Sequence, residues 1–178
     1  MKSTMIVLAL LLAGLRTNEN WTADAASAKV QFTVSGPFGT VHGNFTGLKA
    51  SIDFDEAHPE SGSFTASVSV ATISTGIGMR NNDLRNEDIW FQASKYPLIS
   101  FSSKKVEKTA SGFLASGTLT MKGNSRPMAI PFSFSSSGST GLFKGDFKVN
   151  RQDFNLGNKG GSVGEVITIH LEIPVKKA

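Results

Sequence analysis

The chain has 178 residues, with 18 Lys and Arg against 14 Asp and Glu, and it has no cysteine. This length suits one domain with a sizeable hydrophobic core. The lack of cysteine excludes disulfides, thiolate metal sites and a cysteine nucleophile. The mild net charge of +4 is spread along the chain, which argues against nucleic-acid binding.

Residues 1–20 have the features of an export signal. Lys2 supplies a positive start, and residues 6–12 form an apolar run that is too short to span a membrane. A buried N-terminal helix or strand is the alternative. Leu15 stands where a bacterial lipoprotein signal has its lipidated cysteine, so a lipid anchor there is excluded. We expect removal of this leader at a site that the sequence does not identify, leaving residues 21–178 as one domain.

Alternation of apolar and polar residues dominates the rest of the chain. Each run has one bulky apolar face and one face of Ser, Thr or Lys, as antiparallel strands with one wet side require. Turn signals rich in Gly, Ser, Asn or Pro separate the runs. The expected strands cover residues 29–35, 41–45, 47–54, 63–70, 98–103, 113–121, 127–134, 142–149 and 166–175.

Several short strands at this spacing predict a β-sandwich or a β-barrel. The bulky one-sided faces persist to the last strand, which favours a barrel. Gly43, Gly117 and Gly145 fall on the inward face, where a tightly curving sheet needs small residues. A sandwich stays open at this point.

The segment 74–97 breaks the alternation. Met79, Leu84 and Ile89 follow a roughly helical spacing, and Asn and Asp residues are available as caps. We expect one or two short helical turns around residues 78–92 that link two strands and lie against one end of the barrel.

No arrangement in the sequence predicts catalysis or a metal site. His42 and His170 are expected on outward faces and His58 in a loop, without the close spacing of metal ligands. No serine lies in a nucleophile elbow, and no acid–base pair is recognisable. We therefore expect neither an enzyme, nor a cofactor, nor a bound metal.

The stretch "STGIGMRNNDLRNEDIWF", residues 74–91, raises the question of an anion site. Its "TGIG" lacks the Lys-Ser/Thr of a phosphate-binding loop, so that hypothesis is weak. For Arg80 we favour an ion pair with a nearby acid; contact with a polar head group at a barrel mouth is the alternative.

Several stretches together resemble the YceI-like family across the whole expected domain. They are "GPFGTVHGNFTGLKASIDFD", "SVATISTGIGMRNNDLRNEDIWFQASKYPLISFSS", "ASGTLTMKGNSRPMAIPF", "FKGDFKVNRQDFNLG" and "VGEVITIHLEIPVKK". The resemblance implies an all-β protein, an eight-stranded antiparallel lipocalin-like barrel that is periplasmic or secreted. It also implies an apolar cavity that holds a long-chain isoprenoid or another amphiphilic lipid without turning it over.

The residues expected to contact such a ligand are inward apolar side chains and two arginines. We expect the two arginines, Arg80 and Arg151, at the mouth of the cavity. The apolar set is Phe32, Phe45, Phe101, Leu119, Phe132, Phe147 and Ile169. The sequence indicates no partner other than the lipid. It leaves open whether the protein forms a homodimer. The rival interpretation is a structural or stress-response barrel with a filled core and no ligand.

The sequence departs from the family at two places. Ser27 and Ala28 occupy the positions where the family commonly has His-Ser, and Asn81 and Asp83 replace an Asp and a His that usually follow the arginine at position 80. The resemblance therefore gives no support in this chain for a head-group contact or a proton-linked role of those side chains.

Overall fold

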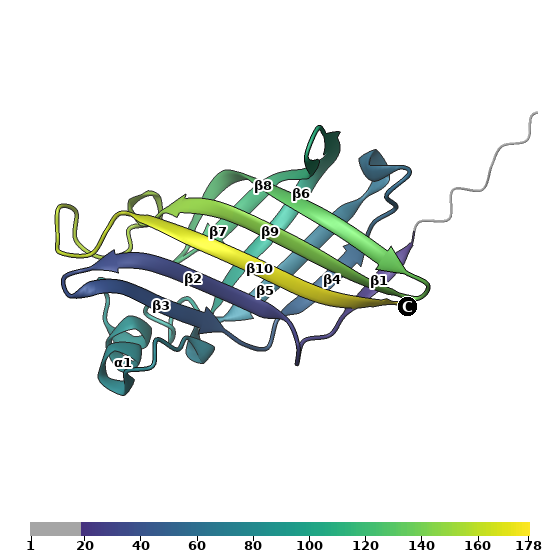
Figure 1. Ribbon diagram of the computed structural model, residues 1–178. Coiled ribbons are helices and arrows are strands. Elements are labelled where there is room, and N and C mark those ends of the chain that lie inside the picture. Colours follow the sequence, from purple (N-terminus) through teal and green to yellow (C-terminus); the bar gives the residue numbers. More distant parts are fainter. Residues whose placement is uncertain (1–18) are drawn as a thin grey trace, which may run out of the picture.

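The computed structural model describes residues 19–178. The expected leader lies outside the described residues except for its last two positions, Glu19 and Asn20, and Asn20 already begins the first strand. The described chain forms one antiparallel sheet with a single α-helix and three short 3-10 helices (Figure 1). No helix within this part of the chain has the length and apolar character needed to cross a membrane.

The strands follow the predicted runs closely, and most are longer than expected. The helix α1 covers Gly78–Asn86. The strands are β1 (Asn20–Ala23), β2 (Lys29–Gly36), β3 (Gly39–Phe45), β4 (Lys49–Asp53), β5 (Ser63–Ser69), β6 (Leu98–Thr109), β7 (Gly112–Met121), β8 (Asn124–Ser137), β9 (Thr140–Asn150) and β10 (Val166–Lys177).

The sheet closes on itself through β10. The strands run in the order β1-β4-β5-β6-β7-β8-β9-β10, and β10 pairs back with β1, where Trp21 lies opposite Lys177. These eight strands form a closed ring, and the hairpin β2–β3 extends it beside the first half of β10. The eight-stranded antiparallel barrel is therefore confirmed, and the sandwich is excluded. The prediction missed β1, because four residues with one large apolar side chain show no alternation.

The strand β3 has a nearly free edge. On that edge Asn44 and Ser74 exchange two backbone hydrogen bonds of 2.9 Å, and the Thr46 N–H donates to Thr72 Oγ1 at 3.1 Å. The connection between β5 and β6, residues 70–97, is thereby attached to the barrel beside β3. It carries α1.

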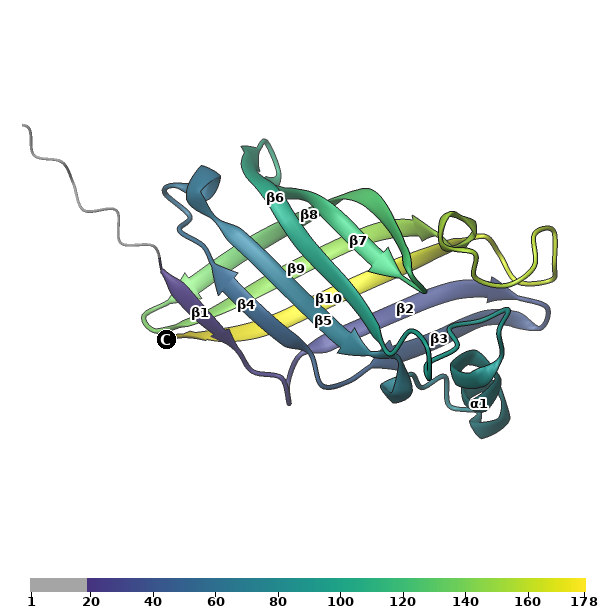
Figure 2. The same cartoon turned by 180° about the vertical axis from the view of Figure 1, so that it is seen from behind.

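The two ends of the barrel differ (Figures 1 and 2). We call the end that carries α1 the helix end; its connections are residues 37–38, 70–97, 122–123 and 151–165. The opposite end, which we call the terminal end, holds the start of β1 and the end of β10. Its connections are residues 54–62, 110–111 and 138–139.

The helix α1 confirms the predicted helical connection but corrects its details. It has nine residues, or about two and a half turns, and is followed by non-helical turns. The expected Asn or Asp cap is wrong, because the N-cap is Ile77 and no side chain caps the helix. Leu84 packs on the barrel core, whereas Met79 is 79% exposed, so helical spacing alone did not identify the buried face.

The inward glycines allow close approach, as expected. A Cβ on Gly43 would lie 2.2 Å from the ring of Phe32, which therefore covers this glycine. A Cβ on Gly117 would lie 2.2 Å from the carbonyl oxygen of Ser102, next to a bulge between Ser103 and Lys105 of β6. Both strands can curve inward here only because no side chain intervenes.

Two clusters of buried apolar residues lie inside the barrel, one toward each end. At the terminal end, Phe54 is fully buried, and its ring lies 5.1–5.7 Å from five other phenylalanine rings. Trp21 joins this cluster by an edge contact with Phe134 and by an Nε1–H bond of 2.9 Å to the Phe54 carbonyl. We call it the aromatic cluster; its rings are Trp21, Phe54, Phe64, Phe113, Phe132, Phe134 and Phe143.

Candidate functional site: an apolar cavity inside the barrel

A cavity of about 480 Å³ lies inside the barrel. Its lining is largely apolar and comes from most of the strands. This volume falls within the roughly 300–1,000 Å³ typical of sites for small organic ligands. The residues that were predicted to contact a ligand all line this one cavity: Phe32, Phe45, Phe101, Leu119, Phe132, Phe147, Ile169, Arg80 and Arg151.

The aromatic cluster forms the floor of the cavity. Phe64, Phe132 and Phe143 line the cavity and also pack on one another with ring centroids 5.4–5.9 Å apart. Phe132 therefore has two roles, since one of its sides belongs to the packed core and another faces the cavity. No connection at the terminal end contributes to the lining among the described residues, so the cavity is closed at this end.

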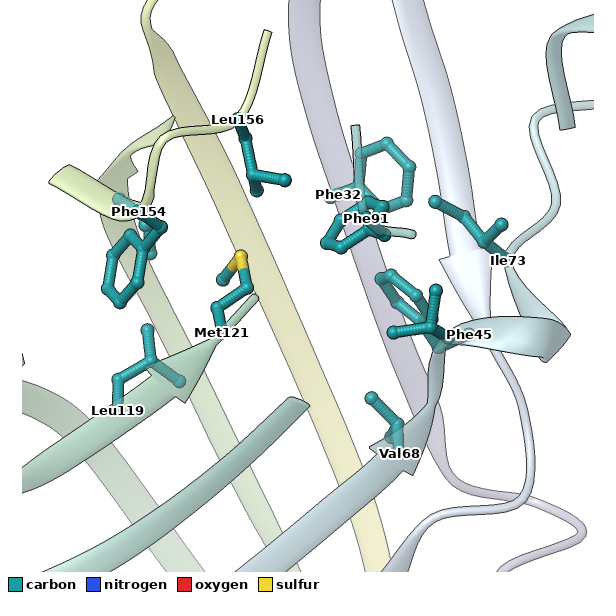
Figure 3. Close-up of a cluster of buried hydrophobic side chains, with 11 residues drawn as sticks. Phe32, Phe45, Val68, Ile73, Phe91, Leu119, Met121, Phe154 and Leu156 are labelled. Carbon is teal, nitrogen blue, oxygen red and sulfur yellow. The ribbon is translucent and has the colours of Figure 1, made fainter. Parts of the chain in front are cut away.

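At the helix end, side chains from the connections meet those of the strands. Figure 3 shows Leu119, Met121 and Leu156 facing Phe32 and Phe45 across the interior, with Phe91 beside Phe32. Phe45 and Phe91 make an edge contact with centroids 6.2 Å apart. The apolar residues that the connections supply to the lining are Ile73, Leu84, Trp90, Phe91, Leu156 and Val163.

Sequence reasoning did not predict these six residues as ligand contacts. Alternation identifies the inward face of a strand, but it says nothing about a connection that folds over a barrel end. A signal was nevertheless present, because Trp90 and Phe91 are adjacent large apolar residues within an otherwise polar segment.

Polar groups reach the cavity from the first part of the 70–97 connection. Thr75, Arg80 and Asp83 all line it. The guanidinium of Arg80 donates from Nε to Thr75 Oγ1 at 2.8 Å and from Nη2 to the Thr75 carbonyl at 2.7 Å. The predicted ion pair is wrong: these bonds go to Thr75 and not to an acid. They use two of the five N–H donors of Arg80.

Asn81 holds Thr75 from the other side. Its Oδ1 is buried and accepts from the Thr75 N–H at 2.8 Å and from Thr75 Oγ1 at 2.7 Å. Since two donors converge on this one oxygen, an amide or a carboxylate fits the position. The departure from the family at residue 81 therefore keeps an acceptor, whereas Asp83 brings an acid to the cavity lining.

Arg151 lies at the cavity but is engaged by the protein. It is only 2% exposed, and its guanidinium donates to four backbone carbonyls. The acceptors belong to Leu156, Asn158, Val163 and Gly164, all in the connection between β9 and β10. Burial lowers the pKa of Arg151, and the nearby charge of Glu165 acts in the opposite direction. Four of its five donors thus organise this connection and are not directed at the cavity.

Further contacts join the connections at the helix end. Lys122 donates to the carbonyls of Asp88 and Asn155, and burial lowers the pKa of its amine. The Gly157 N–H donates to the Ile89 carbonyl at 2.6 Å, and a Cβ on this glycine would lie 2.6 Å from the Trp90 ring. Three connections therefore pack together around this end of the cavity.

The described residues show no arrangement for metal chemistry. No group of three or more His, Asp or Glu in residues 19–178 is placed to hold a metal ion. His42 is exposed, and His170 contacts Asp146 on the outer face of the sheet. The groups at the cavity can form hydrogen bonds and present charge, but they include no nucleophile paired with a base.

Fold and cavity together define a lipocalin-like barrel, in which eight antiparallel strands enclose an apolar interior. The YceI-like domain model matches residues 21–175, and the chain belongs to this family. A UPF0312 protein of Photorhabdus laumondii is 27% identical over 142 residues, which cover 74% of this chain and 73% of that protein.

Solved structures agree with this assignment. The crystal structure of BcnA from Burkholderia cenocepacia has 26% sequence identity and a TM-score of 0.80, covering 86% of this chain and 99% of that chain. A polyisoprenoid binding domain from Saccharophagus degradans has 13% identity and a TM-score of 0.66, covering 89% and 98%. At that identity the second likeness concerns the fold alone.

Proposed function

We propose that this protein is an exported lipid-binding protein that holds a long-chain isoprenoid or a similar amphiphilic lipid in its barrel. The observation that carries the proposal is the apolar cavity of about 480 Å³, whose charged lining residues, Arg80, Asp83 and Arg151, all come from connections at the helix end. An elongated apolar chain would be buried along the strands, and a polar head would lie at the helix end. Membership of the YceI-like family and the structural likeness to the polyisoprenoid binding domain from Saccharophagus degradans support this class of ligand.

Apolar contact would supply most of the affinity. Burying about 400 Å² of a prenyl chain at ~25 cal/mol/Å² contributes on the order of 10 kcal/mol before association and ordering costs. The inward residues Phe101, Phe147 and Ile169 are only partly buried by the protein itself, so they have surface left to offer a ligand.

The two arginines have different roles in this proposal. Arg80 keeps three N–H donors beyond its bonds to Thr75, so it is the candidate for contact with a polar head group. Arg151 has most of its donors on backbone carbonyls, so it positions the connection that covers the cavity.

Binding without catalysis fits the cavity better than lipid turnover does. The groups that line it include no recognisable nucleophile with a base, and an apolar interior favours holding a chain. The rival interpretation, a structural or stress-response barrel without a ligand, requires a filled interior. A cavity of this size argues against it. The signal-like pattern expected from the sequence of residues 1–20 supports a periplasmic or secreted location.

Native mass spectrometry of gently purified protein tests the ligand. We expect an added mass that is lost on organic extraction and is regained when a prenyl lipid is offered. A clean apo mass that shows no uptake of prenyl lipids would contradict the proposal. Incubation with a radiolabelled prenyl lipid should leave that lipid chemically unchanged, whereas a new labelled product would indicate an enzyme.

A matched pair of variants locates the binding site. Ala66 on β5 lines the cavity, whereas Ser133 on β8 is exposed, lies opposite Lys144 of β9 and does not line it. Ala66→Phe should fill part of the cavity and reduce lipid uptake at least tenfold, because the chain loses room and contact area. Ser133→Phe should leave uptake unchanged. Equal uptake by both folded variants would place the ligand elsewhere.

A further inference from the structure

The large apolar side chains that are exposed to solvent concentrate at one end of the barrel. Within residues 19–178, Phe38 is fully exposed at the tip of the β2–β3 hairpin, and Met79 is 79% exposed at the start of α1. The others lie in the helix-end connections or begin the strands that leave them. The full set is Phe38, Ile77, Met79, Ile89, Leu98 and Val166. The terminal end has no such side chain among the described residues.

Charge distinguishes the two ends less than apolar surface does. The connections of the helix end contain six Lys or Arg and five Asp or Glu, whereas those of the terminal end contain three acids, Asp55, Glu56 and Glu60, and no Lys or Arg. The chain ends add Lys176 and Lys177 to the terminal end, and lysines of β6 precede its 110–111 connection. The exposed apolar side chains therefore distinguish the two ends more clearly than charge does.

The exposed apolar side chains lie at the end of the barrel from which the charged groups of the cavity come. The β2–β3 hairpin, α1 and the 151–165 connection project from the same end in both views (Figures 1 and 2). Thr75 and Arg80, which line the cavity, lie within five residues of Ile77 and Met79 in sequence. Apolar surface outside the barrel is thus next to the helix end of an apolar interior.

We propose that the helix end docks on a phospholipid bilayer, with Phe38 and Met79 inserted among the head groups. Single exposed apolar residues are ordinary on protein surfaces, but their restriction to one end of this barrel is not. Aromatic and aliphatic side chains that project from a surface gain by entering the interfacial layer of a membrane. Docking would place the helix end of the cavity at the membrane, so that a lipid that enters there need not cross water.

A bilayer fits these side chains better than a second copy of the chain. They project from separate connections, and Phe38 stands alone at a hairpin tip. A stable protein interface buries about 800 Å² on each partner in a continuous, complementary patch. Insertion into lipid requires only that the side chains protrude. Transfer of a lipid from the membrane into the cavity depends on the function proposed above, whereas docking of the protein on the membrane does not.

Flotation with vesicles of phosphatidylethanolamine and phosphatidylglycerol tests docking on delipidated protein. The wild type should float with the vesicles. The double variant Phe38→Ser, Met79→Ser should have a partition coefficient that is lower by on the order of tenfold or more. Both side chains are exposed, so the folded state should be unaffected, which circular dichroism checks. Unchanged flotation of the double variant, or no flotation of the wild type, overturns the proposal.

Tryptophan probes at the two ends test orientation. Phe38→Trp should be quenched by brominated phospholipids in the vesicles, whereas Ser139→Trp, on the exposed β8–β9 turn of the terminal end, should not. Equal quenching at both positions overturns the proposed orientation. A concentration-dependent dimer in analytical ultracentrifugation that is lost in Phe38→Ser would instead assign this end to self-association.

These outcomes are separate from those for the ligand. Lipid uptake measured by native mass spectrometry requires no vesicle, and flotation of delipidated protein requires no ligand in the cavity. A protein that takes up prenyl lipid but does not float retains the proposed function and loses the docking inference. A protein that floats but takes up no lipid shows the reverse.

Discussion

Arg151 and Arg80 are two guanidinium groups at one cavity with different relations to the protein. Arg151 is almost fully buried and donates to four carbonyls of one connection, whereas Arg80 is partly buried and donates only to Thr75. A buried guanidinium must have its donors satisfied, because an unpaired buried charge is costly. The first arginine therefore contributes to structure, and the second retains donors for a ligand.

Arg151→Lys tests this structural role. Lysine keeps the charge but cannot reproduce the planar fork that reaches Leu156, Val163 and Gly164, so we expect the free energy of unfolding to fall by about 3 kcal/mol. Urea denaturation measures the change. Arg126→Lys is the matched control, since Arg126 is exposed and its guanidinium donates to the carbonyl of the neighbouring Ser125. Unchanged stability of Arg151→Lys with lost lipid uptake would make Arg151 a ligand residue.

The packing of the strands depends on close approach of their backbones as well as on their apolar faces. The β6 and β7 backbones approach each other where Gly117 faces Ser102 and Ser103, at the bulge in β6. The connections at the helix end are organised differently, by hydrogen bonds to backbone carbonyls from Arg151 and Lys122. Strand geometry is thus set by small residues and connection geometry by long cationic side chains.

Gly117→Ala should destabilise the barrel. The added Cβ would lie 2.2 Å from the Ser102 carbonyl oxygen, which is backbone and cannot move aside easily. We expect a loss of about 1–3 kcal/mol in urea denaturation. Gly78→Ala is the control, because nothing lies within 4 Å of its Cβ and alanine favours the helix that begins there. Equal stability of the two variants would show that the strands relax without cost.

The whole molecule divides its interior between packing and space. The aromatic cluster fills the terminal end around the fully buried Phe54, and the cavity lies between this cluster and the helix end. Barrels of eight strands are just wide enough either to be filled by side chains or to hold one small ligand. This barrel is filled by side chains at the terminal end and encloses a cavity farther along its axis. Stability and ligand binding should therefore respond to different residues.

Phe54→Ala tests this division. Removing the ring at the centre of the aromatic cluster should lower the free energy of unfolding by about 3–5 kcal/mol. Phe38→Ala, which removes a fully exposed ring, should change it by no more than about 0.5 kcal/mol. Thermal and urea unfolding measure both. A small effect at Phe54 would mean that the cluster repacks and does not anchor the terminal end.

Much of this architecture was predictable from local pattern. Alternation identified nine strand runs and their inward faces, and the predicted apolar contacts from Phe32 to Ile169 all line one cavity. The prediction failed where pattern is short or absent. The strand β1 is too brief to alternate, and the cap of α1 is Ile77 without any side-chain bond. The cavity contacts of Trp90 and Leu156 depend on how connections fold over the barrel end.

Strand class, turn positions and the inward faces follow from the sequence because side chains of a strand alternate with a period of two, which neighbouring residues reveal. Closure of the ring, the cavity and the partners of the arginines required the folded chain. Trp21 meets Lys177 across 156 positions, and Arg151 finds carbonyls in a connection that has no periodicity. A guanidinium bonds whichever acceptors the fold brings near it, so its partners are a property of the tertiary structure.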